Sequence, residues 1–265
     1  MSLELLARAL GAQRRSGVIW VICLVALAAS VVALWPSMSE SGSLDAMVAG
    51  LSPELVSAFG LADLGSPVGF LNGNLYALLL PLAFSALGIM HMTTLTAGDE
   101  DAGRLELLLA LPVSRTQVYV TRVAAVAIVL AFANLAVGAV VGLGGAAFDM
   151  NLGGEGVTAA TVALFLLALF HAALAFGLAG AGLRASAVSG VSFGVLMLGY
   201  LGHAVLPLAE GLADAALASP WEWALGEHPL ENGFDAPGLG ALGVGIVVFT
   251  AVGLIAVRRR TIRTV

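Results

Sequence analysis

The sequence predicts an all-α, polytopic membrane protein with six transmembrane helices. The 265-residue chain is 60% hydrophobic and only 11% charged, whereas charged residues make up roughly 25% of ordinary soluble domains. Its 11 basic residues are all Arg, and they cluster between long uncharged stretches. A soluble protein could not cover its surface with so few charges, so the composition excludes a soluble enzyme, a disordered chain and a nucleic-acid-binding protein.

Uncharged stretches locate the six spans, because a charge at the bilayer centre costs roughly 2.5–3.5 kcal/mol on insertion scales. The runs long enough to cross a bilayer are 16–39, 64–98, 123–148, 156–183, 185–209 and 236–257. The helical cores are predicted at about 18–35, 74–97, 118–143, 158–181, 187–208 and 238–257. Little chain remains for a soluble domain, so residues 1–265 are predicted to form a single transmembrane domain.

The arginines predict the orientation. All 11 lie before the first span, between or just inside the second and third, between the fourth and fifth, or after the sixth. The positive-inside rule then places both termini in the cytoplasm, and the chain is expected in the cell's inner (plasma) membrane. The apolar run 18–34 is long and ends in Leu34-Trp35-Pro36, so it is predicted to be an uncleaved first span rather than a signal peptide.

Amphipathic segments outside the spans predict surface helices. Residues 1–15 place apolar side chains on one helical face, which predicts an interfacial helix on the inner leaflet; a frayed tail is the alternative. In the outer loop 36–73, an apolar stripe from Leu44 to Leu51 and the helix start Ser52-Pro53-Glu54 predict two short helices. The outer loop 209–237 carries Trp221 and Trp223, whose pairing is typical of a membrane interface.

Few side chains within the membrane could carry chemistry. Away from their ends, the predicted spans contain no Asp, Glu or Arg, which argues against an ion-coupled carrier. The polar candidates His91, Asn134, His171 and His203 have no metal-ligand spacing, so hydrogen-bonded packing is the favoured interpretation of the histidines. An intramembrane enzyme that uses them is the alternative. The single cysteine, Cys23, excludes an internal disulfide and a cysteine-built metal site.

The loop between the second and third spans is the most informative segment. Three acids, Asp99 to Asp101, precede a Leu-rich run and favour a helix N-terminus. Pro112 ends that helix, and Ser114 with Gln117 forms a capping box for the next. Glu100 and Arg104 are predicted to pair at i,i+4, and the stripe of the helix consists of Leu105, Leu108 and Leu109. A short helix over about 102–111 is therefore expected on the cytoplasmic face, either as a surface-resting connector or as a docking element for a soluble partner.

This stretch resembles the signature of type-2 ABC exporter permeases, in which an acid, a Gly and a Leu-rich run lead into Pro-x-Ser-Arg before the third span. Here the signature runs from Glu100 through Gly103 to Pro112-Val113-Ser114-Arg115. Arg104 stands where the family commonly has Thr. Two weaker stretches, starting at Phe59-Gly60 and at Ser219-Pro220-Trp221, are also similar to the family.

The resemblance implies a permease subunit that encloses a pathway as a dimer, with an identical or homologous second permease. A separate cytoplasmic P-loop ATPase would bind ATP and Mg, since this chain has no Lys for a Walker A loop and is expected to hold no cofactor and to be no enzyme. The implied coupling helix would dock that ATPase through Glu100, Gly103, Arg104, Glu106, Leu108 and Leu109. The alternatives are an ABC-family permease that transmits mechanical work without transport, a secondary carrier or channel, and an intramembrane enzyme.

Overall fold

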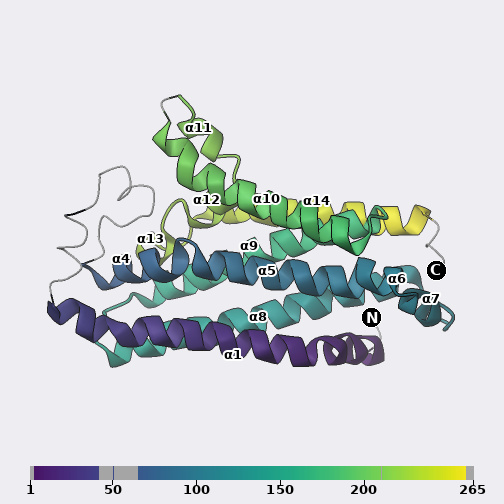
Figure 1. Cartoon of the computed structure of the whole chain (residues 1–265), viewed down its shortest axis with the longest axis horizontal. Coiled ribbons are helices and arrows are strands. Elements are labelled where there is room, and N and C mark those ends of the chain that lie inside the picture. Colours follow the sequence, from purple (N-terminus) through teal and green to yellow (C-terminus); the bar gives the residue numbers. More distant parts are fainter. Residues whose placement is uncertain (1–2, 42–49, 51–64, 210, 261–265) are drawn as a thin grey trace.

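The structure is a bundle of long helices that lie roughly side by side (Figure 1). It is a computed structural model that describes residues 3–41, 50, 65–209 and 211–260, and these ranges contain no β-strand. Within them, the helices long and apolar enough to cross a membrane are Leu3–Ser39, Pro67–Asp101, Arg115–Ala147, Gly154–Gly180, Ala185–Leu208 and Ala236–Arg259. Every predicted span core lies within one of these helices or ends one residue beyond it, so the all-α, six-span fold class is confirmed.

Five spans are built on single helices, α1 (Leu3–Ser41), α8 (Arg115–Ala147), α9 (Gly154–Gly180), α10 (Ala185–Val205) and α14 (Ala236–Arg259). The second span is a composite of α4 (Pro67–Leu71), η1 (Asn72–Tyr76), α5 (Leu79–Thr93), η2 (Thr94–Gly98) and α6 (Asp99–Asp101), in which η1 and η2 are π-helical. The short connecting helices are α7 (Arg104–Leu109), η3 (Leu206–Leu208), α11 (Ala213–Ala216), α12 (Pro220–Leu225) and α13 (Pro229–Asn232).

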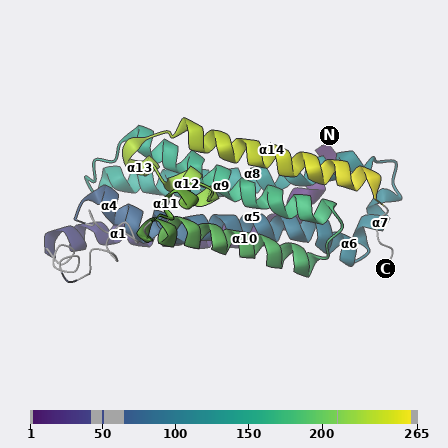
Figure 2. The ribbon, with the colours of Figure 1, turned by 90° about the horizontal axis from the view of Figure 1, so that it is seen from above.

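Helix α9 forms the centre of the bundle and packs against α5, α8, α10, α12, α13 and α14 (Figures 1 and 2). It is apolar on all sides and rich in buried Ala and Gly, as expected for a helix surrounded by others. Small residues let backbones approach closely. A Cβ on Gly180 would lie 2.6 Å from the carbonyl oxygen of Gly253 on α14, so that crossing requires Gly.

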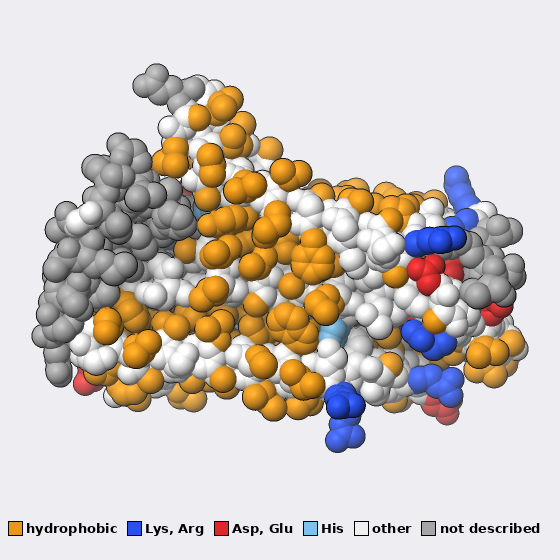
Figure 3. Space-filling model, viewed as in Figure 1, with side chains coloured by type: hydrophobic (Ala, Val, Ile, Leu, Met, Phe, Trp, Pro, Cys, Tyr) orange, Lys and Arg blue, Asp and Glu red, His pale blue; other side chains and the backbone are white. Residues whose placement is uncertain are grey.

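The start of α1, the end of α14 and helices α6 and α7 all lie at one end of the bundle (Figure 1). Most charged side chains in view gather there, whereas an apolar surface covers the middle of the molecule (Figure 3). We call this the arginine-rich end. The start of the first span and the end of the sixth therefore lie on the same side, as an even number of spans requires.

The first helix corrects one prediction. Residues 3–15 form no separate interfacial helix but continue without a break into the first span. The reason is a polar contact with the second span: the Nδ1 of His91 on α5 lies 2.5 Å from the Oε1 of buried Gln13. This contact holds the start of α1 along the bundle rather than flat on a membrane surface.

The loop before the sixth span contains the expected short helices, α11 to α13, and its two tryptophans pack on the bundle. Trp221 is fully buried, with its ring 5.0 Å from that of Tyr200 on α10, and Trp223 meets Phe170 of α9 edge-on. The helices predicted from the 44–54 pattern in the first outer loop lie outside the described residues, apart from Gly50.

Candidate functional site

The acids at the end of the second span are the first feature of the arginine-rich end. The sequence suggested that Asp99, Glu100 and Asp101 begin the short loop helix, but they instead form α6, the last turn of the second span. A carboxylate at a helix C-terminus is disfavoured by the helix dipole and needs a cation or a donor nearby. Each of the three acids has such a partner from another part of the chain, and together these contacts form a polar cluster.

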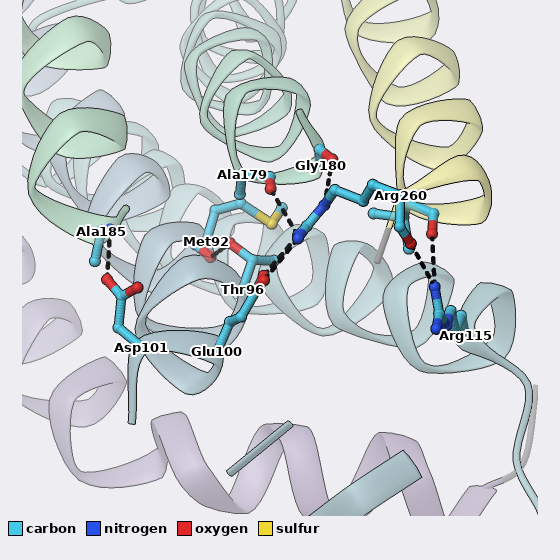
Figure 4. A network of polar contacts seen from close by, with 10 residues as sticks. Met92, Thr96, Glu100, Asp101, Arg115, Ala179, Gly180, Ala185 and Arg260 are labelled. Atoms are coloured by element: carbon cyan, nitrogen blue, oxygen red, sulfur yellow. Dashed lines mark hydrogen bonds and ion pairs between the residues drawn. The ribbon is translucent and has the colours of Figure 1, made fainter. Parts of the chain in front are cut away.

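Glu100 is bound by Arg260, the residue that ends α14 (Figure 4). The Nη1 and Nη2 atoms of Arg260 lie 2.6 and 2.5 Å from the two carboxylate oxygens of Glu100. Glu100 is only 1% exposed, and the two-pronged geometry is the strongest form of an arginine–carboxylate contact. The predicted i,i+4 pair between Glu100 and Arg104 is therefore wrong, because Glu100 points into the bundle instead.

Arg260 also closes the end of the central helix. Its Nε donates to the carbonyl oxygen of Gly180 at 2.8 Å, and its Nη2 donates to that of Ala179 at 3.2 Å (Figure 4). These are among the last carbonyls of α9, which lack an i+4 partner within the helix; the N–H of Gly182 also donates to the carbonyl oxygen of Ala179 at 3.0 Å. Hydrogen bonding to Glu100 raises the pKa of the Arg260 guanidinium above its ordinary value, so the group stays charged. One side chain thus joins the ends of α6, α9 and α14.

Asp101 caps the next span in the same way. The backbone N–H of Ala185, the first residue of α10, donates to the Oδ2 of Asp101 at 2.8 Å (Figure 4). The residue before it, Arg184, provides no side-chain cap. A carboxylate near a helix N-terminus accepts an otherwise unpaired N–H and matches the positive end of the dipole. The second span is therefore tied to the start of α10 as well.

Asp99 bridges two arginines. Its Oδ1 accepts from the Nε of Arg104 at 2.8 Å, and its Oδ2 accepts from the Nη2 of Arg122 at 2.7 Å. Arg104 begins α7 and its side chain is 58% exposed, whereas the Arg122 side chain on α8 is 6% exposed. The short loop helix is in this way linked to the second and third spans.

Arg115 completes the cluster at the start of α8. Its Nη1 donates to the backbone carbonyl of Arg260 at 2.7 Å (Figure 4), and the Nε of Arg258 donates to the hydroxyl of Thr116 at 3.1 Å. The expected capping box of Ser114 and Gln117 is present at this helix start. The third span therefore begins against the end of the sixth.

Helix α7 has one inward and one outward face. Gly103 precedes it with a φ of +70°, a left-handed conformation that Gly adopts at no steric cost and that turns the chain sharply after α6. The predicted stripe of Leu105, Leu108 and Leu109 packs into the bundle, with Leu105 fully buried. The outward face of α7 carries Arg104 and Leu107, of which Leu107 is 76% exposed, and exposed Leu111 follows in the bend after the helix.

The sequence-predicted site residues therefore divide into three groups. Glu100 is internal; Leu108, Leu109 and Glu106 are partly buried; and Gly103 is a turn residue beside exposed Arg104. Arg260, Arg115 and Leu107 belong to the site but were not predicted. No local pattern marks Arg260, since it lies 160 positions from Glu100, whereas the i,i+3 spacing of Arg104 and Leu107 on one helical face is contained in the sequence.

The histidines lie in separate places and not in one site. His91 contacts Gln13 and Ser16 of α1, His171 lies 2.9 Å from the carbonyl oxygen of Leu167 in its own helix, and His203 lies beside Glu222 of α12. In the described part of the chain, no three His, Cys, Asp or Glu side chains gather as metal ligands. Each of these three histidines has a hydrogen-bond partner, which agrees with the packing interpretation.

Comparison with known protein families identifies a match. The family model described as "Multidrug efflux system permease Rv1217c, C-terminal domain" matches residues 4–258. No curated protein matches the chain. The matched segment includes all six spans, the polar cluster except Arg260, and α7. The chain therefore belongs to the family of multidrug efflux permeases that this domain defines.

Proposed function

We propose that the chain is the membrane subunit of an ATP-driven ABC exporter, which docks a separate cytoplasmic ATPase through α7 and works as a dimer of permeases. The observation that carries the proposal is that α7 has an exposed face and is also ion-paired to the spans. The multidrug efflux in the family's description favours drug-like, amphipathic cargo. ATP and Mg would be bound by the partner, since this chain has no Lys for a phosphate loop.

The exposed face of α7 suits a protein partner. Arg104 and Leu107 are three positions apart on α7 and therefore neighbours on its surface, and exposed Leu111 follows just beyond the helix, so a partner could contact them together. Leu107 and Leu111 would provide apolar contact and Arg104 a charge-assisted hydrogen bond. Glu100 is one of the docking residues that the resemblance implies, but it is bound to Arg260. It would contribute to coupling through this contact inside the bundle and not by touching the ATPase. The main role of three partly buried residues would be to hold α7 against the bundle, and not to contact the ATPase: Glu106, Leu108 and Leu109.

The polar cluster connects α7 to the spans through ion pairs and hydrogen bonds. Arg104 pairs with Asp99, which also pairs with Arg122 of α8. The next two residues of α6 contact Arg260 at the end of α14 and Ala185 at the start of α10. We propose that an ATPase pushing on α7 would move α6, and that these contacts would pass the movement to α8, α9, α10 and α14.

The test is co-purification of the ATPase and dye efflux by the two-chain complex, with Leu107→Asp as the variant. A charge at the centre of the exposed face should reduce both readouts, while the yield of folded permease stays unchanged because the side chain is outside the core. Leu217→Asp is the matched control, since Leu217 is 63% exposed but lies far from α7. Normal ATPase association and efflux by Leu107→Asp would show that α7 is only a connector.

A further inference from the structure

A cavity of about 320 Å³ opens beside the polar cluster, between the start of α1, the end of the second span, α7 and the start of α8. Four of its lining residues are charged: Arg8, Asp99, Arg104 and Arg122. Three guanidinium groups face one carboxylate, so the lining carries a formal charge of +2. Its electrostatics therefore favour an anion.

The buried part of the lining has unused hydrogen-bonding capacity. Arg122 uses its Nη2 for Asp99, but its Nη1 is buried and has no partner among the described residues. The hydroxyl of the neighbouring Thr121 is likewise buried, and no partner for it is found in the described part of the chain. Both atoms are shielded from the cavity as well as from solvent, so the net charge of the lining, and not these two atoms, favours an anion.

The rest of the lining is apolar. Side chains from α1, η2, α7 and α8, among them Ala12, Leu95 and Leu108, complete the wall. A small soluble anion would leave this surface unmatched, whereas a lipid would match both parts. The charged side chains of the lining lie at the arginine-rich end of the bundle, where the spans end. Phospholipid head groups lie at this depth of a membrane.

We propose that this cavity binds an anionic phospholipid, with its phosphate at the guanidinium groups of Arg8, Arg104 and Arg122 and the start of its acyl chains against the apolar wall. Guanidinium groups recognise phosphate oxygens in a two-pronged manner. Bound lipid would then contact both α1 and α7, which lie on different sides of the cavity. This inference does not depend on ATPase docking.

The test uses the full chain purified in detergent and native mass spectrometry of the bound lipid. Dioleoyl phosphatidylglycerol is the probe, dioleoyl phosphatidylcholine tests the need for net negative charge, and glycerol phosphate tests a soluble phosphate. Arg8→Gln and Arg104→Gln should each weaken binding of the anionic lipid by about fivefold, as expected for one basic residue near a charged head group. Arg14→Gln is the matched control, because Arg14 is exposed on the same helix but does not line the cavity.

A second pair of variants separates the cavity from general surface charge. Ala12→Phe fills the cavity without changing charge and should abolish retention of the lipid, whereas Ala7→Phe, at an exposed position outside the lining, should not. Unchanged lipid affinity in Arg8→Gln, Arg104→Gln and Ala12→Phe would overturn the proposal. Equal affinity for phosphatidylcholine, or binding of glycerol phosphate as tight as that of the anionic lipid, would overturn it too.

Discussion

Glu100 and Arg260 are 160 positions apart in the sequence, yet they form a two-pronged ion pair that joins the end of the second span to the end of the sixth. Glu100 is almost fully buried, and Arg260 also satisfies the terminal carbonyls of α9. Paired buried charges contribute little net stability, but removal of one partner leaves the other uncompensated. The pair therefore holds the ends of three spans together, and its loss would allow them to separate.

Glu100→Gln should lower the free energy of unfolding by about 3 kcal/mol, near the lower end for a broken buried pair because Arg260 keeps some access to water. Arg260→Gln should have a similar effect, and the double variant should lose less than the sum of the two. Thermal unfolding of the purified protein measures this. Arg259→Gln is the control, since Arg259 is the exposed neighbour. Equal stability of all four variants would mean that the pair does not hold the spans.

Asp101 should be needed for the start of α10. Asp101→Ala removes the acceptor for the N–H of Ala185 and should cost about 1 kcal/mol, typical of a lost N-cap. Asp101→Asn retains an acceptor oxygen and should largely restore the cap. Hydrogen exchange of residues 185–188, followed by mass spectrometry, should be faster in the Ala variant than in the Asn variant. Identical hydrogen exchange in the two variants would show that Asp101 does not cap α10.

Gly103 should be sensitive to backbone conformation. With φ at +70°, Gly103→Ala should destabilise the turn by about 1–2 kcal/mol, whereas Gly103→Asn should be better tolerated because Asn visits the left-handed region. Thermal unfolding compares the two. If Ala were tolerated as well as Asn, left-handed strain would not explain the Gly.

The orientation of the bundle should follow the arginines. In a Cys23→Ala background, Ala218→Cys should react with an impermeant maleimide added to intact cells, and Ala110→Cys on α7 should react only after lysis. Both positions are exposed, and they lie on either side of the apolar middle of the bundle. The reverse pattern would place the arginine-rich end outside and would leave no route for a cytoplasmic ATPase to reach α7.

The sequence predicted the spans well and the contacts between them poorly, for a physical reason. Membrane insertion depends on local hydrophobicity, so uncharged runs locate helices without knowledge of their neighbours. The ion-pair partner of Glu100 depends on which helix ends meet in the bundle. Distance along the sequence points to Arg104, the nearest basic residue, and that partner is wrong. Similarly, the pattern at Leu105, Leu108 and Leu109 indicated an apolar face but not that the bundle itself would cover it.

The glycine pairs show the same limit. Both Gly138-x-x-x-Gly142 and Gly190-x-x-x-Gly194 predict close packing, within the bundle or between subunits. The first packs inside the bundle, since a Cβ on Gly138 would lie 2.5 Å from the Oγ1 of Thr161 on α9. A Cβ on Gly190 or Gly194 would meet no described atom within 4 Å. Sequence alone could not distinguish the two cases.

The open face of α10 should be the contact between two copies of the chain, if the proposed dimer forms through small residues. Helix α10 is among the least buried spans, and Gly190 and Gly194 would let a second helix approach closely. The combined Gly190→Leu and Gly194→Leu variant should therefore shift the detergent-solubilised protein from dimer to monomer while its unfolding temperature stays unchanged. Mass photometry over a range of protein concentrations measures the shift.

Two control variants make this last experiment specific. Gly240→Leu, on the equally open surface of α14, should leave the dimer intact, whereas Gly138→Leu should lower the unfolding temperature because Thr161 occupies the space. If Gly240→Leu dissociated the dimer and the α10 variant did not, the interface would lie on α14. A wild-type chain that stays monomeric at every concentration would exclude a self-associated pathway and would require a different permease as the second subunit.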